Sequence, residues 1–151
     1  MQSLTLQPGY RDATILMVED SQDDVALASR ALRDSGYAGQ LSVARDGAEA
    51  LDMLLGRGEH EGSAVHPRLI LLDLTLPGLE GLALLEWIRS HPEARMTPVV
   101  VFTSSDDPED IRKAYMGGAS AYVGKPVKAS AYVATVKSIV EFWLRVNRVA
   151  Y

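Results

Sequence analysis

The sequence predicts an α/β fold in which a doubly wound parallel sheet of five strands carries five helices on its two faces. Short apolar runs recur five times along the chain, and such runs are typical of strands that are buried on both faces of a parallel sheet. A segment with apolar residues at helical spacing follows each run. Alternation of strand and helix implies right-handed crossovers, which place helices on both faces of the sheet.

The predicted strands are the apolar runs themselves, and most of them stop abruptly at a polar or charged residue. They comprise residues 14–18, 41–44, 69–72, 98–102 and 121–123. The run at 69–72 (LILL) is the most apolar of them. We therefore expect this strand at the centre of the sheet.

The predicted helices lie between these strands, and acidic residues, glycines or prolines mark their ends. They comprise about residues 23–35, 48–55, 82–89, 108–116 and 128–146. A polar stretch before the third strand is expected to be a mobile surface loop. The chain then divides into a flexible N-terminal segment (1–13), one domain with an extended final helix (14–146) and a tail (147–151).

Composition excludes several classes of function. The chain has 151 residues, which is enough for one domain and too few for a separate output domain. A net charge of -5 argues against nonspecific nucleic-acid binding. The sequence has no cysteine, which excludes disulfides and thiolate metal sites. No apolar run approaches the length that spans a bilayer, so we expect a cytoplasmic protein without membrane contact.

Chemically active side chains gather where the predicted strands end. Glu19, Asp20, Asp73, Thr103 and Lys125 each lie at, or within two residues of, the carboxyl end of a strand. Those ends share one edge of a parallel sheet, where ligands bind at the topological switch point. The five side chains should therefore converge in one crevice.

Three carboxylates in one crevice repel one another unless a cation neutralises them. A set of oxygen ligands without His or Cys favours Mg2+. We expect Asp20 and Asp73 to bind the ion directly and Glu19 to act mainly through water. The backbone carbonyl of Thr75 could complete the set.

One of these carboxylates can act as a nucleophile toward phosphorus. Asp73 is the best candidate because it ends the strand expected at the centre. Lys125 supplies a compact ammonium for the negative charge of the transition state, and Thr103 supplies a hydroxyl donor. A cis bond between Lys125 and Pro126 would aim the lysine into the crevice.

Other polar residues have plainer interpretations. Two acidic pairs, Asp23-Asp24 and Asp106-Asp107, precede or begin predicted helices and are interpreted as helix-starting charges, not as metal ligands. The three histidines lie in polar loops without ligand spacing, and we assign them no chemistry.

Several motifs occur in an order that resembles the CheY-like response regulator receiver domain, over roughly residues 14–140. They are the acidic pair Glu19-Asp20, LILLD ending at Asp73, LTLPGLEG, PVVVFTSS around Thr103 and AYVGKP ending in Lys125-Pro126. One such motif alone would be weak evidence for the family. The full set in order implies the flavodoxin-like strand order 2-1-3-4-5.

The resemblance also implies a function and a set of roles. The phosphoacceptor maps to Asp73, the acidic metal-binding pair to Glu19 and Asp20, and the characteristic lysine to Lys125. Thr103 maps to the switch hydroxyl and Tyr122 to the switch aromatic, which turns inward when Thr103 moves toward the phosphoryl group. Such proteins take the phosphoryl group from a sensor histidine kinase and catalyse only their own phosphorylation and slow dephosphorylation.

Two positions in this family tune the lifetime of the phosphoryl group, and here they hold Thr75 and Ser105. Neither is an acid or an amide, so a long-lived phosphoryl state is expected. Glu19 in place of the commoner Asp, the long loop before the third strand and the EFWL segment of the last helix are similar to phytochrome-associated single-domain response regulators. That similarity implies a bacterial phytochrome as the kinase.

The last predicted helix carries more apolar residues than one contact with the sheet requires. Beyond the row that suits the sheet, a second row could form an interface. We predict a homodimer that uses Tyr132, Ile139, Phe142 and Trp143. The alternative is that this row packs against the N-terminal segment or the chain end.

Three other functions fit the sequence less well. A haloacid-dehalogenase-like phosphatase also uses an Asp at a strand end, but it needs a second Asp where this chain has Thr75. A flavodoxin-like nucleotide binder needs a Gly-rich loop after the first strand, and none is present. A degenerate receiver that only binds partners is disfavoured by the complete set of acids, Thr103 and Lys125.

Overall fold

The computed structural model describes residues 14–76 and 80–148, and these form one parallel sheet with helices on both faces. The order of the strands in the sheet is β2-β1-β3-β4-β5, which confirms the predicted fold and topology. The predicted N-terminal segment 1–13 and the last three residues of the predicted tail lie outside the described residues.

The strands are short and the helices are two to four turns long. The strands are β1 (Thr14–Val18), β2 (Gln40–Ala44), β3 (Leu69–Leu72), β4 (Val99–Thr103) and β5 (Ala121–Gly124). The helices are α1 (Gln22–Asp34), α2 (Gly47–Leu55), α3 (Gly81–Ser90), α4 (Pro108–Met116) and α5 (Ala129–Glu141). A short 3-10 helix, η2 (Gly58–His60), lies in the loop before β3, and a π-helical turn, η3 (Phe142–Val146), extends α5.

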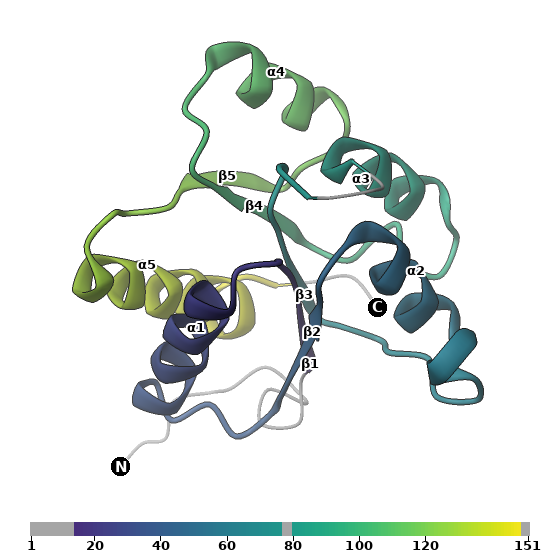
Figure 1. The fold of residues 1–151 in the computed structure, drawn as a ribbon, viewed down its shortest axis with the longest axis horizontal. Helices are drawn as coiled ribbons and strands as arrows, with labels where there is room; N and C mark the ends of the chain where they lie inside the picture. The colour runs from purple at the N-terminus through teal and green to yellow at the C-terminus, as the bar shows by residue number, and fades with distance from the viewer. Residues whose placement is uncertain (1–13, 77–79, 149–151) are drawn as a thin grey trace.

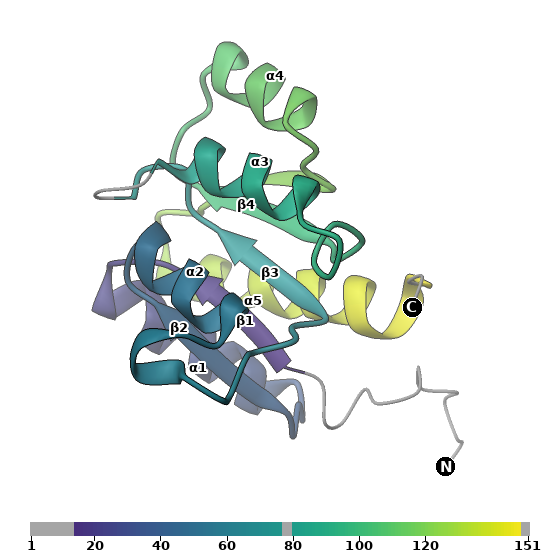
Figure 2. The same cartoon turned by 90° about the vertical axis from the view of Figure 1, so that its right-hand side faces the viewer.

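Figure 1 and Figure 2 show that α1 and α5 cover one face of the sheet, while α2 and α3 cover the other. Two separate hydrophobic clusters correspond to these faces, and the central strands β1, β3 and β4 contribute to both. Every residue of β3 is buried, as expected for the central strand. This packing fixes the positions of the strand ends that carry the polar side chains.

Local sequence explains where the helices begin. Ser21 caps α1 by accepting a hydrogen bond from the Asp24 N–H, and Asp46 caps α2 by accepting one from the Glu49 N–H. Asp107 caps α4 just before Pro108, which suits the first turn of a helix. The interpretation of Asp107 as a helix-start residue is therefore confirmed.

The prediction that a second apolar row of the last helix is available for an interface is wrong for two of its residues. Tyr132 is 2 % exposed and Ile139 is 6 % exposed, and both belong to the cluster that α5 forms with α1 and the sheet. The reason is that α5 is covered by α1 as well as by the sheet, so both apolar rows are used inside the domain. Phe142 is exposed and Trp143 is half-buried, in the π-helical turn.

Within the described residues, no helix combines the length and the apolar character that crossing a membrane requires.

Candidate functional site

The strand register brings the predicted site residues to one edge of the sheet. Val18 of β1 pairs with Leu72 of β3, so Glu19 and Asp73 follow neighbouring positions of adjacent strands. The Asp73 N–H donates to the Val18 carbonyl, which holds the residue beside the end of β1. Thr103 pairs with Gly124, and the Lys125 N–H donates to the Thr103 carbonyl.

Three acidic side chains converge as the sequence predicts. Oxygen atoms of Glu19, Asp20 and Asp73 lie within 4.8 Å of one another. Glu19 and Asp73 are buried, whereas Asp20 is exposed. The set offers only carboxylate oxygens, which suits a hard divalent cation such as Mg2+. One member open to solvent leaves room for the waters that Mg2+ retains.

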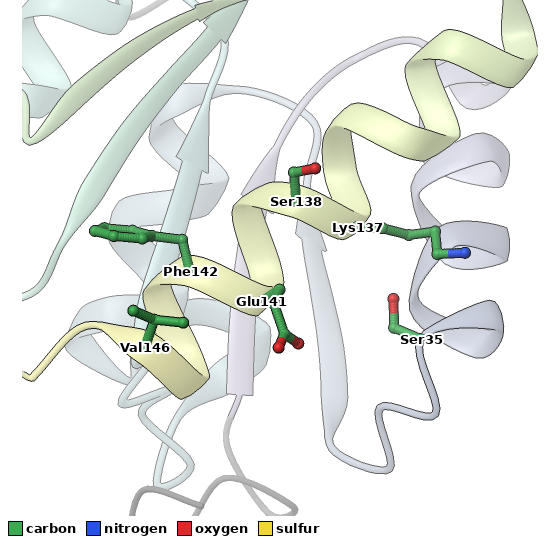
Figure 3. Close-up of a pocket in the computed structure, with 6 residues that line it drawn as sticks. All are labelled: Ser35, Lys137, Ser138, Glu141, Phe142 and Val146. Carbon is green, nitrogen blue, oxygen red and sulfur yellow. The ribbon is translucent and has the colours of Figure 1, made fainter. Parts of the chain in front are cut away.

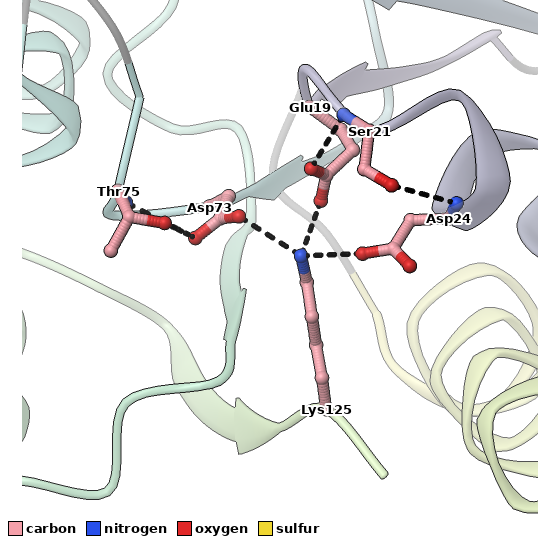
Figure 4. Close-up of polar contacts among 6 residues, drawn as sticks. All are labelled: Glu19, Ser21, Asp24, Asp73, Thr75 and Lys125. Carbon is pink, nitrogen blue, oxygen red and sulfur yellow. Dashed lines mark hydrogen bonds and ion pairs between the residues drawn. The ribbon is translucent and has the colours of Figure 1, made fainter. Parts of the chain in front are cut away.

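Lys125 is the cation of this cluster (Figure 4). Its ammonium donates hydrogen bonds to Glu19 Oε1 at 2.5 Å, Asp24 Oδ2 at 2.8 Å and Asp73 Oδ2 at 2.9 Å. An ammonium has three donors, and all three are used. Burial alone would lower the pKa of Lys125, but the three carboxylates outweigh that effect and raise the pKa above its usual value. Lys125 is therefore charged at neutral pH.

The two buried acids differ in their tendency to ionise. Burial raises the pKa of Glu19 above its usual value, although Lys125 and the Ser21 N–H hydrogen-bond to it. Burial also acts on Asp73, but hydrogen bonds from Lys125 and the Thr75 N–H outweigh it, so the pKa of Asp73 is lowered. Asp73 is therefore held as a carboxylate, the form that a nucleophile requires.

Thr75 and Gly81 shape the backbone around Asp73. The N–H and the hydroxyl of Thr75 each donate to Asp73 Oδ1 at 3.1 Å. Gly81 begins α3 so close to the site that a Cβ atom there would lie 2.7 Å from the Asp73 carbonyl oxygen and 2.8 Å from Leu74 Cα. Only glycine permits this approach.

Thr103 carries a buried hydroxyl that has no hydrogen-bond partner in the described part of the chain. A buried polar group without a partner is costly, and it is expected where a ligand supplies the partner. This arrangement suits a donor to a phosphoryl oxygen.

Tyr122 and Ser105 connect β5 to the loop that follows β4. The Tyr122 hydroxyl donates to the Ser105 carbonyl at 2.9 Å, and Ser105 Oγ donates to Asp110 Oδ2 at 2.6 Å. The hydroxyl of Ser105 is thus engaged with α4. The switch role of Tyr122 and the lifetime role of Ser105 remain predictions.

One expectation about the site is wrong and another is incomplete. The bond between Lys125 and Pro126 is trans, because β5 already ends at the sheet edge and its next residue reaches the cluster from there. Asp24 is more than a helix-starting charge, since its carboxylate pairs with Lys125. The sequence carried no signal for this contact, because Asp24 sits beside Asp23 in an acidic first turn that the helix dipole already explains.

Comparisons with known proteins agree with this geometry. The family model of the response regulator receiver domain matches residues 15–137. Among curated relatives, the probable methanogenesis regulatory protein FilR2 of Methanothrix harundinacea is 39 % identical over 134 residues, which are 89 % of this chain and 85 % of the relative. The response regulator Rcp1 of Synechocystis sp. is 37 % identical over 130 residues, which are 86 % of this chain and 88 % of Rcp1.

Solved structures extend the similarity to the fold. The phosphorylated cyanobacterial phytochrome response regulator RcpA superposes with a TM-score of 0.87 and 35 % identity, over 93 % of this chain and 99 % of RcpA. The Mn2+-bound form of Rcp1 superposes with a TM-score of 0.85 and 34 % identity, over 92 % of this chain and 99 % of Rcp1.

Proposed function

The chain belongs to the response regulator receiver domain family of two-component signalling, and we propose that Asp73 is its phosphoacceptor. One observation carries this assignment: Asp73 is a buried carboxylate with a lowered pKa, placed between the ammonium of Lys125 and the donors of Thr75. Its neighbours Glu19 and Asp20 complete a set that suits a divalent cation.

The proposed reaction is transfer of a phosphoryl group from the phosphohistidine of a kinase. An Asp73 carboxylate oxygen attacks phosphorus while the phosphorus–nitrogen bond breaks, and the electron pair of that bond stays on the imidazole. Negative charge spreads over the three equatorial oxygens of the transition state. Lys125 and the Thr103 hydroxyl are the donors placed to stabilise those oxygens.

We propose Mg2+ as the cation, held by Asp20 and Asp73 directly, by Glu19 mainly through water and by the Thr75 carbonyl. The acidic trio and the Mn2+-bound form of the relative Rcp1 support a divalent ion. When bound, the ion neutralises charge on the acids and on the transferring group. Lys125 then no longer has to neutralise the acids alone.

We propose a sensor histidine kinase of the bacterial phytochrome type as the partner. The support is that RcpA, one of the structures that superpose with this chain, is a phytochrome response regulator. The exchange would take place in the cytoplasm. Receiver proteins of this kind are signalling switches, and this chain would catalyse only its own phosphorylation and slow dephosphorylation.

The proposed output is a change in a protein-binding surface. Thr103 would turn toward the phosphoryl group, and Tyr122 would turn into the vacated space and leave the Ser105 carbonyl it now contacts. Thr75 and Ser105 would give a long phosphoryl lifetime, since neither orients an attacking water well. A phosphoryl half-life of seconds at room temperature would contradict the proposed long lifetime.

We also propose a homodimer formed through the exposed end of the last helix. Of the four residues predicted for this interface, Tyr132 and Ile139 are buried and Trp143 is half-buried, so Phe142, at 47 % exposed, is the one that remains fully available. Its neighbour Val146 is 61 % exposed and extends the apolar surface. Both residues border an open, mainly apolar hollow of about 430 Å³ beside Ser35 and Lys137 (Figure 3). Sedimentation of wild type and Phe142→Ala, with and without beryllofluoride, tests this, and a monomer throughout would remove the dimer.

The phosphoacceptor is tested by incubating the protein with Mg2+ and acetyl phosphate and measuring intact mass. Wild type should gain one phosphoryl group, and Asp73→Asn should gain none. Asp34→Asn is the matched control, because Asp34 is exposed at the far end of α1, and it should behave as wild type. Phosphorylation that persists in Asp73→Asn would move the acceptor elsewhere, and an unmodified wild type would indicate a degenerate receiver.

A further inference from the structure

Lys125 has one carboxylate partner that lies outside the predicted metal set. Of its three acceptors, Glu19 and Asp73 belong to the trio whose oxygens converge within 4.8 Å, and Asp24 does not. The side chain of Asp24 is 24 % exposed, and its carboxylate approaches the ammonium from α1, on the side away from Thr75 (Figure 4).

The carboxylate of Asp24 is free for this contact because another residue caps the helix. Ser21 accepts the hydrogen bond from the Asp24 N–H. Asp24 Oδ2 can therefore approach the Lys125 ammonium to 2.8 Å. This ion pair joins residues 101 positions apart in the sequence, and it links α1 to the residue that follows β5.

The other two partners of Lys125 have a second task in the proposed reaction. Glu19 and Asp73 are the carboxylates that a cation shares, and Asp73 is also the group that forms the acyl phosphate. Once that bond forms, one Asp73 oxygen is part of the acyl phosphate anhydride, and the carboxyl group no longer carries its negative charge. The lysine must then redirect donors to phosphoryl oxygens while a fixed partner keeps its long, flexible side chain in place.

From this geometry we propose that Asp24 is a positioning residue for Lys125. Asp24 holds the ammonium at the site through metal binding and phosphoryl transfer, while the donors now directed at Glu19 and Asp73 become available to the phosphoryl oxygens. Asp24 contacts neither the metal nor phosphorus in this scheme. The inference rests on the proposed function, because it assigns a role within the same reaction.

The test compares Asp24→Ala with Asp23→Ala. Asp23 lies in the same first turn and is exposed, and its side chain makes no hydrogen bond or ion pair with the described residues. Each variant loses one negative charge near the start of α1, and alanine favours helix. Only Asp24→Ala removes the partner of Lys125, so a difference between the variants reports on that contact.

Three quantities are measured for each variant: the rate of phosphorylation by acetyl phosphate at saturating Mg2+, the affinity for Mg2+ alone by calorimetry, and the thermal stability. Loss of an outer partner that orients an active group typically lowers activity by about 10-fold or more. Asp24→Ala should therefore phosphorylate about 10-fold more slowly than Asp23→Ala, and the two should bind Mg2+ with similar affinity because neither residue belongs to the acidic trio. Asp24→Asn, which retains an acceptor without the charge, should fall between them.

Three results would overturn the inference. A rate in Asp24→Ala equal to or above that of Asp23→Ala would mean that Asp24 does not assist Lys125. Loss of Mg2+ binding as severe as in Asp20→Ala would make Asp24 a metal ligand. An equal slowing in Asp24→Asn and Asp24→Ala together with lost thermal stability in both would indicate a structural role. Failure of wild type to be phosphorylated would instead refute the proposed function.

Discussion

The Lys125 ammonium donates a 2.9 Å hydrogen bond to Asp73 Oδ2, although 52 residues separate the two in the sequence. They meet because β3 and β5, which flank β4 in the sheet, end at the same edge. Both side chains are almost fully buried, at 9 % and 5 % exposed. Because the pair is buried, removal of either charge leaves the other one buried and unpaired, which destabilises the fold.

Replacing Lys125 with methionine should strongly destabilise the metal-free protein. The change leaves Glu19 and Asp73 buried without their cation, and removal of one partner from a buried ion pair costs about 3–5 kcal/mol. Saturating Mg2+ should restore much of the loss, because a divalent cation can neutralise the same acids. Urea unfolding of wild type and Lys125→Met, with and without Mg2+, measures both effects.

Lys128→Met serves as the control for that experiment. Lys128 is exposed, and it forms no ion pair in the part of the chain that the structure describes. Its replacement should change the free energy of unfolding by less than about 0.5 kcal/mol. Equal losses in the two variants, or a loss in Lys125→Met that Mg2+ does not reduce, would contradict the electrostatic account of the cluster.

Thr103→Val should leave the metal-free protein as stable as wild type or raise its stability by about 1 kcal/mol. The Thr103 hydroxyl is buried and has no hydrogen-bond partner among residues 14–76 and 80–148, and an unsatisfied buried group costs about 1–3 kcal/mol. Valine also suits a buried strand. The affinity for beryllofluoride with Mg2+ should fall, since a donor to the bound group is lost. A marked loss of stability on urea unfolding would show that the hydroxyl has a partner in the resting protein.

Gly81→Ala should destabilise the protein by about 1–3 kcal/mol, the usual cost of overpacking. The new Cβ would clash with two backbone groups, the Asp73 carbonyl and Leu74 Cα. Backbone atoms cannot relieve such a clash by a change of rotamer, as a side chain can. Phosphorylation should also slow because the shift moves Asp73. Gly124→Ala is the control, since a Cβ there meets nothing within 4 Å. Similar stabilities for the two variants would refute the steric argument.

The sequence predicted the strands because apolar runs that stop at polar residues report both burial and the position of the sheet edge. The order of the strands in the sheet followed from the resemblance to the receiver family and not from the runs themselves. Glu19, Asp73 and Lys125 could be found from the ends of the runs. Asp24 could not, because its contact depends on how α1 packs beside α5, and no local pattern records that distance. Tyr132 and Ile139 were misjudged for a related reason: helical spacing gives the direction of an apolar row but not the element that covers it.

Tyr132→Phe tests whether Tyr132 lies inside the domain, as the structure shows, or at a dimer interface, as the sequence predicted. The Tyr132 hydroxyl is buried and has no hydrogen-bond partner among the described residues, while its ring packs against Phe102 at a centroid distance of 5.0 Å. Phenylalanine keeps the ring contact and removes the unpaired hydroxyl. At neutral pH the variant should therefore be as stable as wild type or up to about 1 kcal/mol more stable.

Alkaline pH should widen the difference. Burial, and then the charge of Asp24, raise the pKa of Tyr132 in the folded protein, whereas an unfolded tyrosine ionises near pH 10. Above about pH 10 the unfolded state loses this proton and the folded state keeps it, so wild type loses stability as pH rises. Lys125 also contributes stability that is lost as pH rises from the unfolded-state value of about 10.4 toward its raised pKa in the folded protein, but that loss is common to both proteins.

Urea unfolding of wild type and Tyr132→Phe from pH 8 to pH 11 measures the predicted divergence. The variant should resist alkaline unfolding better, and its sedimentation should match that of wild type because residue 132 is inside the domain. Parallel stability curves would show that Tyr132 ionises as easily folded as unfolded. If the variant were monomeric where wild type is dimeric, Tyr132 would have to contribute to the dimer interface. Its exposed fraction of 2 % argues against that outcome.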